Sequence, residues 1–271
     1  MKEIKDAVGR ERGSDPKIDF DTFGDLARSS ISEADAMVLL ERYLQPDLQA
    51  LQHDHVVLRN QLFNRLDALP DALSKSNKPD LAYGAEATNL DPAVRDRLGG
   101  SILPTGLENT VCPNFTVAAR GSRGDDFVMN MQAVHDGAVA ARGMQALWCF
   151  GEDAKPVEAD SSSVARMGVG RSLTCTWKMG TLKMYVTYRR DYACDESQDR
   201  PPKASNSPPN FPTYITCLVG IWNMMEREED LESGVAAYRN AMEWAKGQRD
   251  EAIARANRRE VCGLNKWQED T

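Results

Sequence analysis

The part of the sequence that most constrains the fold is an apolar strand followed closely by a long helix. Residues 114–121 read NFTVAARG, which is typical of a buried strand that ends at Arg120 and enters a tight turn. Residues 125–150 form a long helical segment with aspartates at its N-terminal end, where they complement the helix dipole. Small residues that would let this helix lie close on a sheet recur along it: Gly137, Ala138, Ala141 and Gly143.

Two other segments extend the predicted sheet. Residues 78–84 read KPDLAYG and are predicted to form a short strand after a polar loop. Residues 172–190 alternate in polarity around a Met-Gly pair, which predicts a β-hairpin. Residues 85–111 and 151–170 are predicted to be loops.

Helical regions are predicted on both sides of the sheet in the sequence. Ser30 with Glu33, and Ser32 with Asp35, have the spacing of a capping box, so a helix is predicted to begin there. Pro46 is predicted to start a second helix. Its apolar stripe would consist of Leu48, Leu51, His55, Leu58, Leu62 and Leu66. After a proline-rich loop the remainder of the chain is predicted to be helical, with an apolar side formed by Val235, Tyr238, Met242, Ala245, Ala252 and Ala256.

The order of these elements predicts an α/β (α+β) layered fold. Residues 1–29 are polar and are predicted to form a loosely ordered N-terminal segment, and residues 30–271 are predicted to form a single domain. The chain has 271 residues, of which 41% are hydrophobic and 27% charged, so it can bury a sizeable core.

The charge and the cysteine pattern limit the classes of function. The net charge is -8, whereas a dedicated nucleic-acid binder usually has a strongly basic face. Six scattered cysteines without a Cys-x-x-Cys pair, and only three histidines, argue against a structural zinc site. The N-terminus lacks the apolar core of a signal peptide, and no stretch is apolar enough to cross a membrane. We therefore expect an intracellular protein of the nucleus or cytoplasm, with reduced thiols and no membrane partner.

A Pro-Asp pair and a later Ala-Ala-Arg sequence stand where a magnesium-dependent phosphodiesterase would carry its motif. Such an enzyme holds Mg²⁺ between carboxylates on adjacent strands, and a lysine lies two residues beyond the second carboxylate on the same face. The lysine positions the attacking water and offsets charge on the phosphate. Here Asp80 supplies the first carboxylate and is the candidate metal ligand, whereas Ala118 replaces the second acid and Arg120 replaces the lysine.

Five segments, taken in order, resemble a fungal group of PD-(D/E)XK nuclease-like proteins. The segments read KPDLAYG, PNFTVAARG, MQAVHDGAVAARGMQAL, GTLKMYVTY and AYRNAMEWAKGQRDEAI, and they span residues 78–253. The resemblance implies a restriction-endonuclease-like fold, with a central mixed sheet flanked by helices. It also implies that Asp80 is the motif aspartate, that Arg120 stands at the lysine position and that Gln132 is a helix glutamine facing the site.

Two of the central positions depart from the motif of this group. The methyl group of Ala118 cannot ligate a metal, and Arg120 keeps the charge but is bulkier and permanently protonated. The resemblance therefore implies a catalytically degenerate nuclease-like protein that acts as a binding or interaction module, with nucleic acid or another protein as its partner. One alternative is an active Mg²⁺-dependent nuclease that uses Asp80 with a relocated acid, Asp125 or Asp126. A second alternative is an unrelated α/β domain with a structural role.

Several neighbouring residues have simpler interpretations. Asp125 and Asp126 are the acids expected at a helix N-terminus. His55 lies on the predicted leucine stripe and does not share a helix face with His53, so we interpret it as a semi-buried histidine. His135 stands next to an aspartate in the long helix and would act as an acid or base only with a partner that the sequence does not supply.

Overall fold

The computed structural model describes the chain over seven stretches. These are residues 1–12, 18–46, 55–69, 77–107, 109–151, 170–190 and 213–269, with side chains described up to Cys262.

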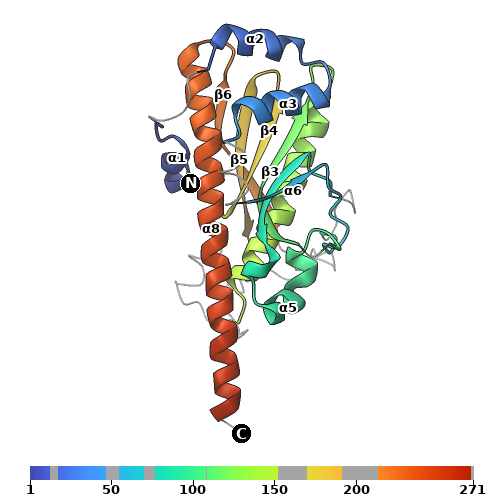
Figure 1. The fold of residues 1–271 in the computed structure, drawn as a ribbon, viewed down its shortest axis with the longest axis vertical. Coiled ribbons are helices and arrows are strands. Elements are labelled where there is room, and N and C mark those ends of the chain that lie inside the picture. The colour runs from blue at the N-terminus through green and yellow to red at the C-terminus, as the bar shows by residue number, and fades with distance from the viewer. Residues whose placement is uncertain are drawn as a thin grey trace, which may run out of the picture.

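A six-stranded mixed sheet forms the centre of the molecule, and its strands lie side by side in sequence order (Figure 1). β3 and β4 are parallel, and every other neighbouring pair is antiparallel. The strands are β1 Val56–Arg59, β2 Leu81–Glu86, β3 Thr110–Arg120, β4 Ser172–Lys178, β5 Thr181–Arg190 and β6 Thr213–Asn223. The predicted α/β class is confirmed.

Helices cover both faces of the sheet, with α8 on one face and α6 on the other (Figure 1). The helical elements are α1 Lys2–Val8, α2 Phe20–Ser29, α3 Glu33–Tyr43, the 3₁₀ turn η1 Ala87–Asn89, α5 Pro92–Ile102, α6 Asp126–Trp148 and α8 Glu228–Glu269. Successive side chains of β3 point alternately towards α8 and towards α6, as expected for a strand. Ala119 belongs to the main core with Tyr238 of α8, whereas Ala118 packs against Met129 and Ala133 of α6.

α6 is the crossover connection that makes β3 and β4 parallel. Asp125 caps its N-terminus, because its carboxylate accepts hydrogen bonds from two backbone N–H groups of the first turn. Gly137 seats the helix on the sheet, since a Cβ atom at this position would collide with the hydroxyls of Thr174 and Thr187. The predicted long helix and its close packing on the sheet are confirmed.

The predicted strands and the hairpin are also present. The turn between β4 and β5 consists of Met179 and Gly180, with φ angles of 47° and 75°. Two successive residues with positive φ are typical of a tight hairpin turn whose twist matches that of the strands. The strand predicted at residues 78–84 is β2, which begins three residues later, at Leu81.

Residues 1–29 differ from the predicted loosely ordered segment. They contain α1 and α2, and four of their side chains are buried in the main core: Ile4, Val8, Phe23 and Ala27. Each pair is four residues apart, so each helix turns one narrow apolar side inward. Two main-core side chains per helix do not stand out in a polar sequence.

The helix predicted to begin at Pro46 is wrong where the structure describes it. Residues 47–54, with His53, lie outside the described residues. From Val56 the chain forms β1, which pairs with β2, and Phe63 forms an isolated bridge with Asn77. Two adjacent valines favour a strand, and the leucine spacing that suggested a helix is compatible with both structures.

Two further predictions need correction. Residues 85–111 are not all loop, because α5 begins within them at an Asp91 cap followed by Pro92 in the first turn. β6 lies in the part of the chain that the sequence predicts to be helical, yet it is a strand that pairs with the whole of β5. Its sequence, TYITCLVGIWN, is rich in β-branched and aromatic residues, which favour a strand. The apolar side predicted for α8 is buried as expected.

The described helices include none that is both long and apolar enough to cross a membrane. The cysteines within the described stretches are free thiols.

Candidate functional site

The three site residues proposed from the sequence lie together where β2 begins and β3 ends. Asp80 immediately precedes β2 and is 4% exposed. Its Oδ2 atom accepts a hydrogen bond from the Ala119 backbone N–H at 2.7 Å and another from Arg120 Nη1 at 3.0 Å. Gln132 reaches the same place from α6, because its Oε1 atom accepts from Arg120 Nη2 at 2.6 Å. Gln132 Nε2 in turn donates to the Lys78 carbonyl at 3.0 Å.

Glu33 is a fourth member of this cluster, and sequence reasoning missed it as a site residue. Arg120 Nη1 donates to Glu33 Oε2 at 2.9 Å, so one guanidinium joins two carboxylates. Glu33 is the first residue of α3, and the capping box between Ser32 and Asp35 fixes where that helix begins. The capping-box spacing predicted where α3 begins. Nothing in the sequence indicated that this end of the helix lies against the end of β3.

A glycine makes this meeting possible. Gly121 follows Arg120, and a Cβ atom there would overlap the backbone of Ile31 and Ser32, directly before α3. The turn is also tied to this region by a hydrogen bond from the Ser122 backbone N–H to the Ser30 carbonyl at 3.0 Å. The glycine that ends NFTVAARG is therefore required for the close approach that brings Glu33 to Arg120.

We expect Gly121→Ala to lower the free energy of unfolding by about 3 kcal/mol, because backbone atoms cannot move aside as a flexible side chain can. Urea denaturation followed by circular dichroism measures the change. Gly247→Ala is the matched control, since nothing lies within 4 Å of a Cβ atom at that position in α8. The control should be neutral or slightly stabilising, because alanine favours a helix. Equal stability of the two variants would contradict the close contact.

The electrostatics of the cluster raise the pKa of Asp80 above its ordinary value. Burial raises its pKa to about 6, and the neighbouring Glu33 acts in the same direction, whereas the Ala119 N–H and Arg120 lower it. A folded-state pKa above the ordinary value means that the group stabilises the fold at low pH. This contribution is lost as the pH rises through about 6.

Asp136 is a second buried carboxyl near the cluster, one helical turn beyond Gln132. It is 1% exposed, and neither carboxyl oxygen has a hydrogen-bond partner among the described residues. Burial, and after it the charge of Asp80, raise its pKa well above the usual range, so the neutral acid is favoured. With Thr116 it lines a cavity of about 10 Å³, which is room for about one water molecule. The adjacent His135 is only partly buried.

The acids considered as replacements for the missing carboxylate are engaged elsewhere. Asp125 is the N-cap of α6, and Asp126 accepts a hydrogen bond from Lys178 Nζ at 2.6 Å. That ion pair lowers the pKa of Asp126. Their interpretation as helix N-terminal acids therefore agrees with the contacts. Over the described stretches, no three His, Cys, Asp or Glu side chains are grouped as a metal site would need.

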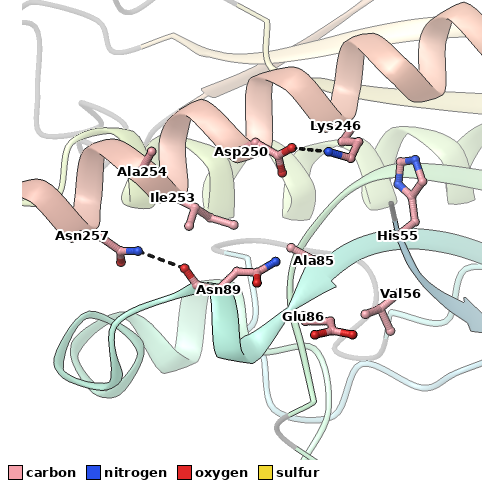
Figure 2. Close-up of a pocket in the computed structure, with 10 residues that line it drawn as sticks. All are labelled: His55, Val56, Ala85, Glu86, Asn89, Lys246, Asp250, Ile253, Ala254 and Asn257. Carbon is pink, nitrogen blue, oxygen red and sulfur yellow. Dashed lines mark hydrogen bonds and ion pairs between the residues drawn. The ribbon is translucent and has the colours of Figure 1, made fainter. Parts of the chain in front are cut away.

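A separate pocket of about 450 Å³ lies between α8 and the segment formed by β1, the end of β2 and η1 (Figure 2). It is lined by His55, Val56, Ala85, Glu86, Asn89, Lys246, Asp250, Ile253, Ala254 and Asn257. Its polar groups are partly paired, since Lys246 binds Asp250 at 2.6 Å and Asn257 donates to the Asn89 carbonyl at 2.9 Å. None of the site residues proposed from the sequence lines it.

Comparison with protein-family models, curated proteins and solved structures gave no match to this chain.

Proposed function

We propose that this protein is a catalytically degenerate PD-(D/E)XK nuclease-like protein that serves as a binding or interaction module. The observation that carries the proposal is the position of Arg120. Its guanidinium lies within hydrogen-bond distance of both Asp80 and Glu33 and is also held by Gln132. In this proposal the permanently charged guanidinium takes the place between two carboxylates that a divalent metal would hold in an active enzyme.

The position of the missing acid supports the same conclusion. Ala118 is fully buried, and its methyl group packs against Met129 and Ala133. Mg²⁺ requires several oxygen ligands in near-octahedral geometry, and a methyl group offers none. The order of elements, with an antiparallel β1–β2–β3 unit followed by α6 and a parallel β4, is compatible with the nuclease-like resemblance.

The partner of such a module would be another protein or nucleic acid. The net charge of -8 favours a protein, because binding to nucleic acid derives much of its affinity from basic side chains.

A cleavage assay tests the loss of activity. Purified protein is incubated with single- and double-stranded DNA and RNA in Mg²⁺ or Mn²⁺, and Mg²⁺ binding is measured in parallel by calorimetry. We expect neither cleavage nor binding. Cleavage that disappears in Asp80→Ala would overturn the proposal in favour of an active nuclease. The relocated acid would then be Glu33, because its carboxylate shares Arg120 Nη1 with Asp80. Asp125 and Asp126 are instead bound by the α6 backbone and by Lys178.

A restoring variant tests the ancestry of the site. Ala118→Glu combined with Arg120→Lys rebuilds the acid-x-lysine pattern on β3, and we expect it to bind Mg²⁺ measurably. Arg120→Lys alone is the matched control, since it leaves position 118 without a carboxylate, and it should not bind. Circular dichroism checks that both variants are folded. A folded double variant that does not bind Mg²⁺ would favour an unrelated α/β domain.

A further inference from the structure

The interface between α6 and the sheet is polar where the helix crosses the middle of the strands. Gly137 seats α6 directly on the hydroxyls of Thr174 in β4 and Thr187 in β5. Both threonines are fully buried, and so is Thr116 of β3. A helix that packs on a sheet ordinarily buries apolar side chains against it. This part of the interface therefore holds polar groups where apolar contacts are usual.

Asp136 adds a carboxyl group to this polar layer. Its side chain is 1% exposed, and neither of its oxygens has a hydrogen-bond partner among the described residues. Two hydroxyls of the layer are bonded elsewhere, since Thr116 Oγ1 donates to Thr174 Oγ1 at 3.3 Å and Ser172 Oγ donates to the Gly137 carbonyl at 3.3 Å. A buried carboxylate normally accepts hydrogen bonds or pairs with a cation, because the removal of its charge from water is costly. An ionised Asp136 would lack the donors that it needs.

The charged groups around Asp136 do not supply a free counter-ion. Within the described part of the chain, Asp80 before β2 and Arg120 at the end of β3 are the charged groups that act on it. Arg120 is already bound to Asp80 and to Glu33, so one cation faces two carboxylates before Asp136 is considered. The Cys112 thiol of β3 lines the same cavity as Asp136 and is neutral, since burial raises its pKa to about 12.

The other elements packed around Asp136 also leave it without a compensating charge. Ser101 of α5 and several apolar side chains line the same cavity. β4 and β5 present the threonine hydroxyls, and over the described stretches neither β6 nor α8 adds a charged group that acts on Asp136. His135 lines a different cavity, together with Asp67. The cavity beside Asp136 has room for about one water molecule, which can hydrate a neutral acid but cannot replace the hydration shell of a carboxylate.

We propose that Asp136 is a pH-sensitive switch in the packing of α6. The helix lies closed on the sheet while the carboxyl is protonated, and it opens when the carboxyl loses its proton, because water then reaches the carboxylate. Burial and the charge of Asp80 raise the pKa of Asp136 in the folded state. The closed packing is therefore fully stable at low pH and is weakened as the pH rises.

The switch acts on the cluster around Arg120, because Gln132 lies one turn before Asp136 on the same helix. Gln132 Oε1 accepts a hydrogen bond from Arg120, and Gln132 Nε2 donates to the Lys78 carbonyl. Opening of α6 withdraws both contacts. The switch depends only on how α6 packs and not on the nuclease-like interpretation, so either proposal can fail without the other.

Native-state hydrogen exchange of the α6 backbone tests the switch. The protection factor compares each amide with an unfolded chain at the same pH, so the intrinsic pH dependence of exchange is removed. From about pH 6.5 to about pH 7.5, the protection of residues 129–141 should fall about tenfold, because each opening releases one proton. This range lies above the pKa of Asp80, which is about 6, so Asp80 contributes little to the change.

Two variants assign the effect to one residue. The fall in protection should vanish in Asp136→Asn, which keeps the shape of the side chain but cannot ionise. Asp126→Asn is the matched control, because Asp126 is an exposed acid on the same helix, and this variant should keep the pH dependence of the wild type. Circular dichroism confirms that each variant is folded.

Carbon-13 NMR of the side-chain carboxyl groups detects the proton directly in the wild-type chain. At about pH 7 the Asp136 signal, assigned through the backbone, should have the chemical shift of a neutral acid, whereas an exposed aspartate is ionised. An ionised Asp136 in the folded protein would overturn the proposal. So would α6 protection that does not change with pH, or a change that persists in Asp136→Asn.

Discussion

Replacing Arg249 with methionine should lower the free energy of unfolding by about 3–5 kcal/mol. Arg249 lies on α8 and is fully buried. Its Nη1 atom donates to the Tyr83 carbonyl at 3.2 Å and to Asn114 Oδ1 at 2.7 Å, and its Nη2 atom contacts His55 Nδ1 at 3.2 Å. Methionine fills similar space but leaves these acceptors without a donor in a place that water does not reach. Urea denaturation followed by tryptophan fluorescence measures the change.

Arg258→Met is the matched control for this variant. Arg258 is exposed on the same helix, two to three turns further on, so its replacement should alter the free energy of unfolding by less than about 0.5 kcal/mol. Similar losses in the two variants would mean that the effect comes from the change in net charge rather than from the buried hydrogen bonds.

Replacing Arg120 with methionine should destabilise the protein by about 3 kcal/mol at neutral pH and by less in acid. The variant leaves the Asp80 and Glu33 carboxylates side by side without a cation. Arg120 lowers the pKa of Asp80, which is about 6, so its removal must raise this pKa further. A raised folded-state pKa lowers stability progressively as the pH rises from the unfolded-state pKa to the folded-state pKa. A higher folded-state pKa in the variant widens this range, so the loss relative to the wild type should be largest at neutral and alkaline pH. The loss of stability should become smaller at lower pH, where Asp80 is protonated.

The measurement is the free energy of unfolding of the wild type and the variant at about pH 5 and about pH 8. Arg123→Met serves as the control, because Arg123 is an exposed cation in the turn that follows β3. A loss that is the same at both pH values would contradict the electrostatic account and indicate a packing defect instead.

The centre of the fold could be predicted because its signals are local. β3 is a mostly apolar segment, α6 begins at an acidic cap, and the Met179–Gly180 pair permits the positive φ angles of a hairpin turn. β6 and α5 were missed for different reasons. A strand of mostly apolar residues shows no clear period, and the start of α5 is marked by one Asp-Pro pair within a polar stretch.

The cluster around Arg120 could be predicted only in part. Asp80, Arg120 and Gln132 were singled out from a motif, and they do lie together. Glu33 could not be found in this way, because it is 87 residues from Arg120 and its contact depends on the packing of α3 against the turn at Gly121. Asp136 stands next to His135 but was not predicted as a site residue, because the sequence does not distinguish a buried acid without a partner from a solvated one.

The position of α8 after all six strands has a consequence for how the molecule folds. Tyr238 bonds Tyr83 across 155 residues, Asn240 bonds the Val8 carbonyl across 232, and Arg249 bonds Asn114 across 135. β2, the N-terminal helix α1 and the middle of β3 therefore gain these contacts only after the last segment of the chain has docked. Contacts so distant in sequence must close long loops before they contribute any stability, so high contact order should make refolding slow. Until α8 docks, the face of β3 that carries Phe115 remains exposed to other unfolded chains.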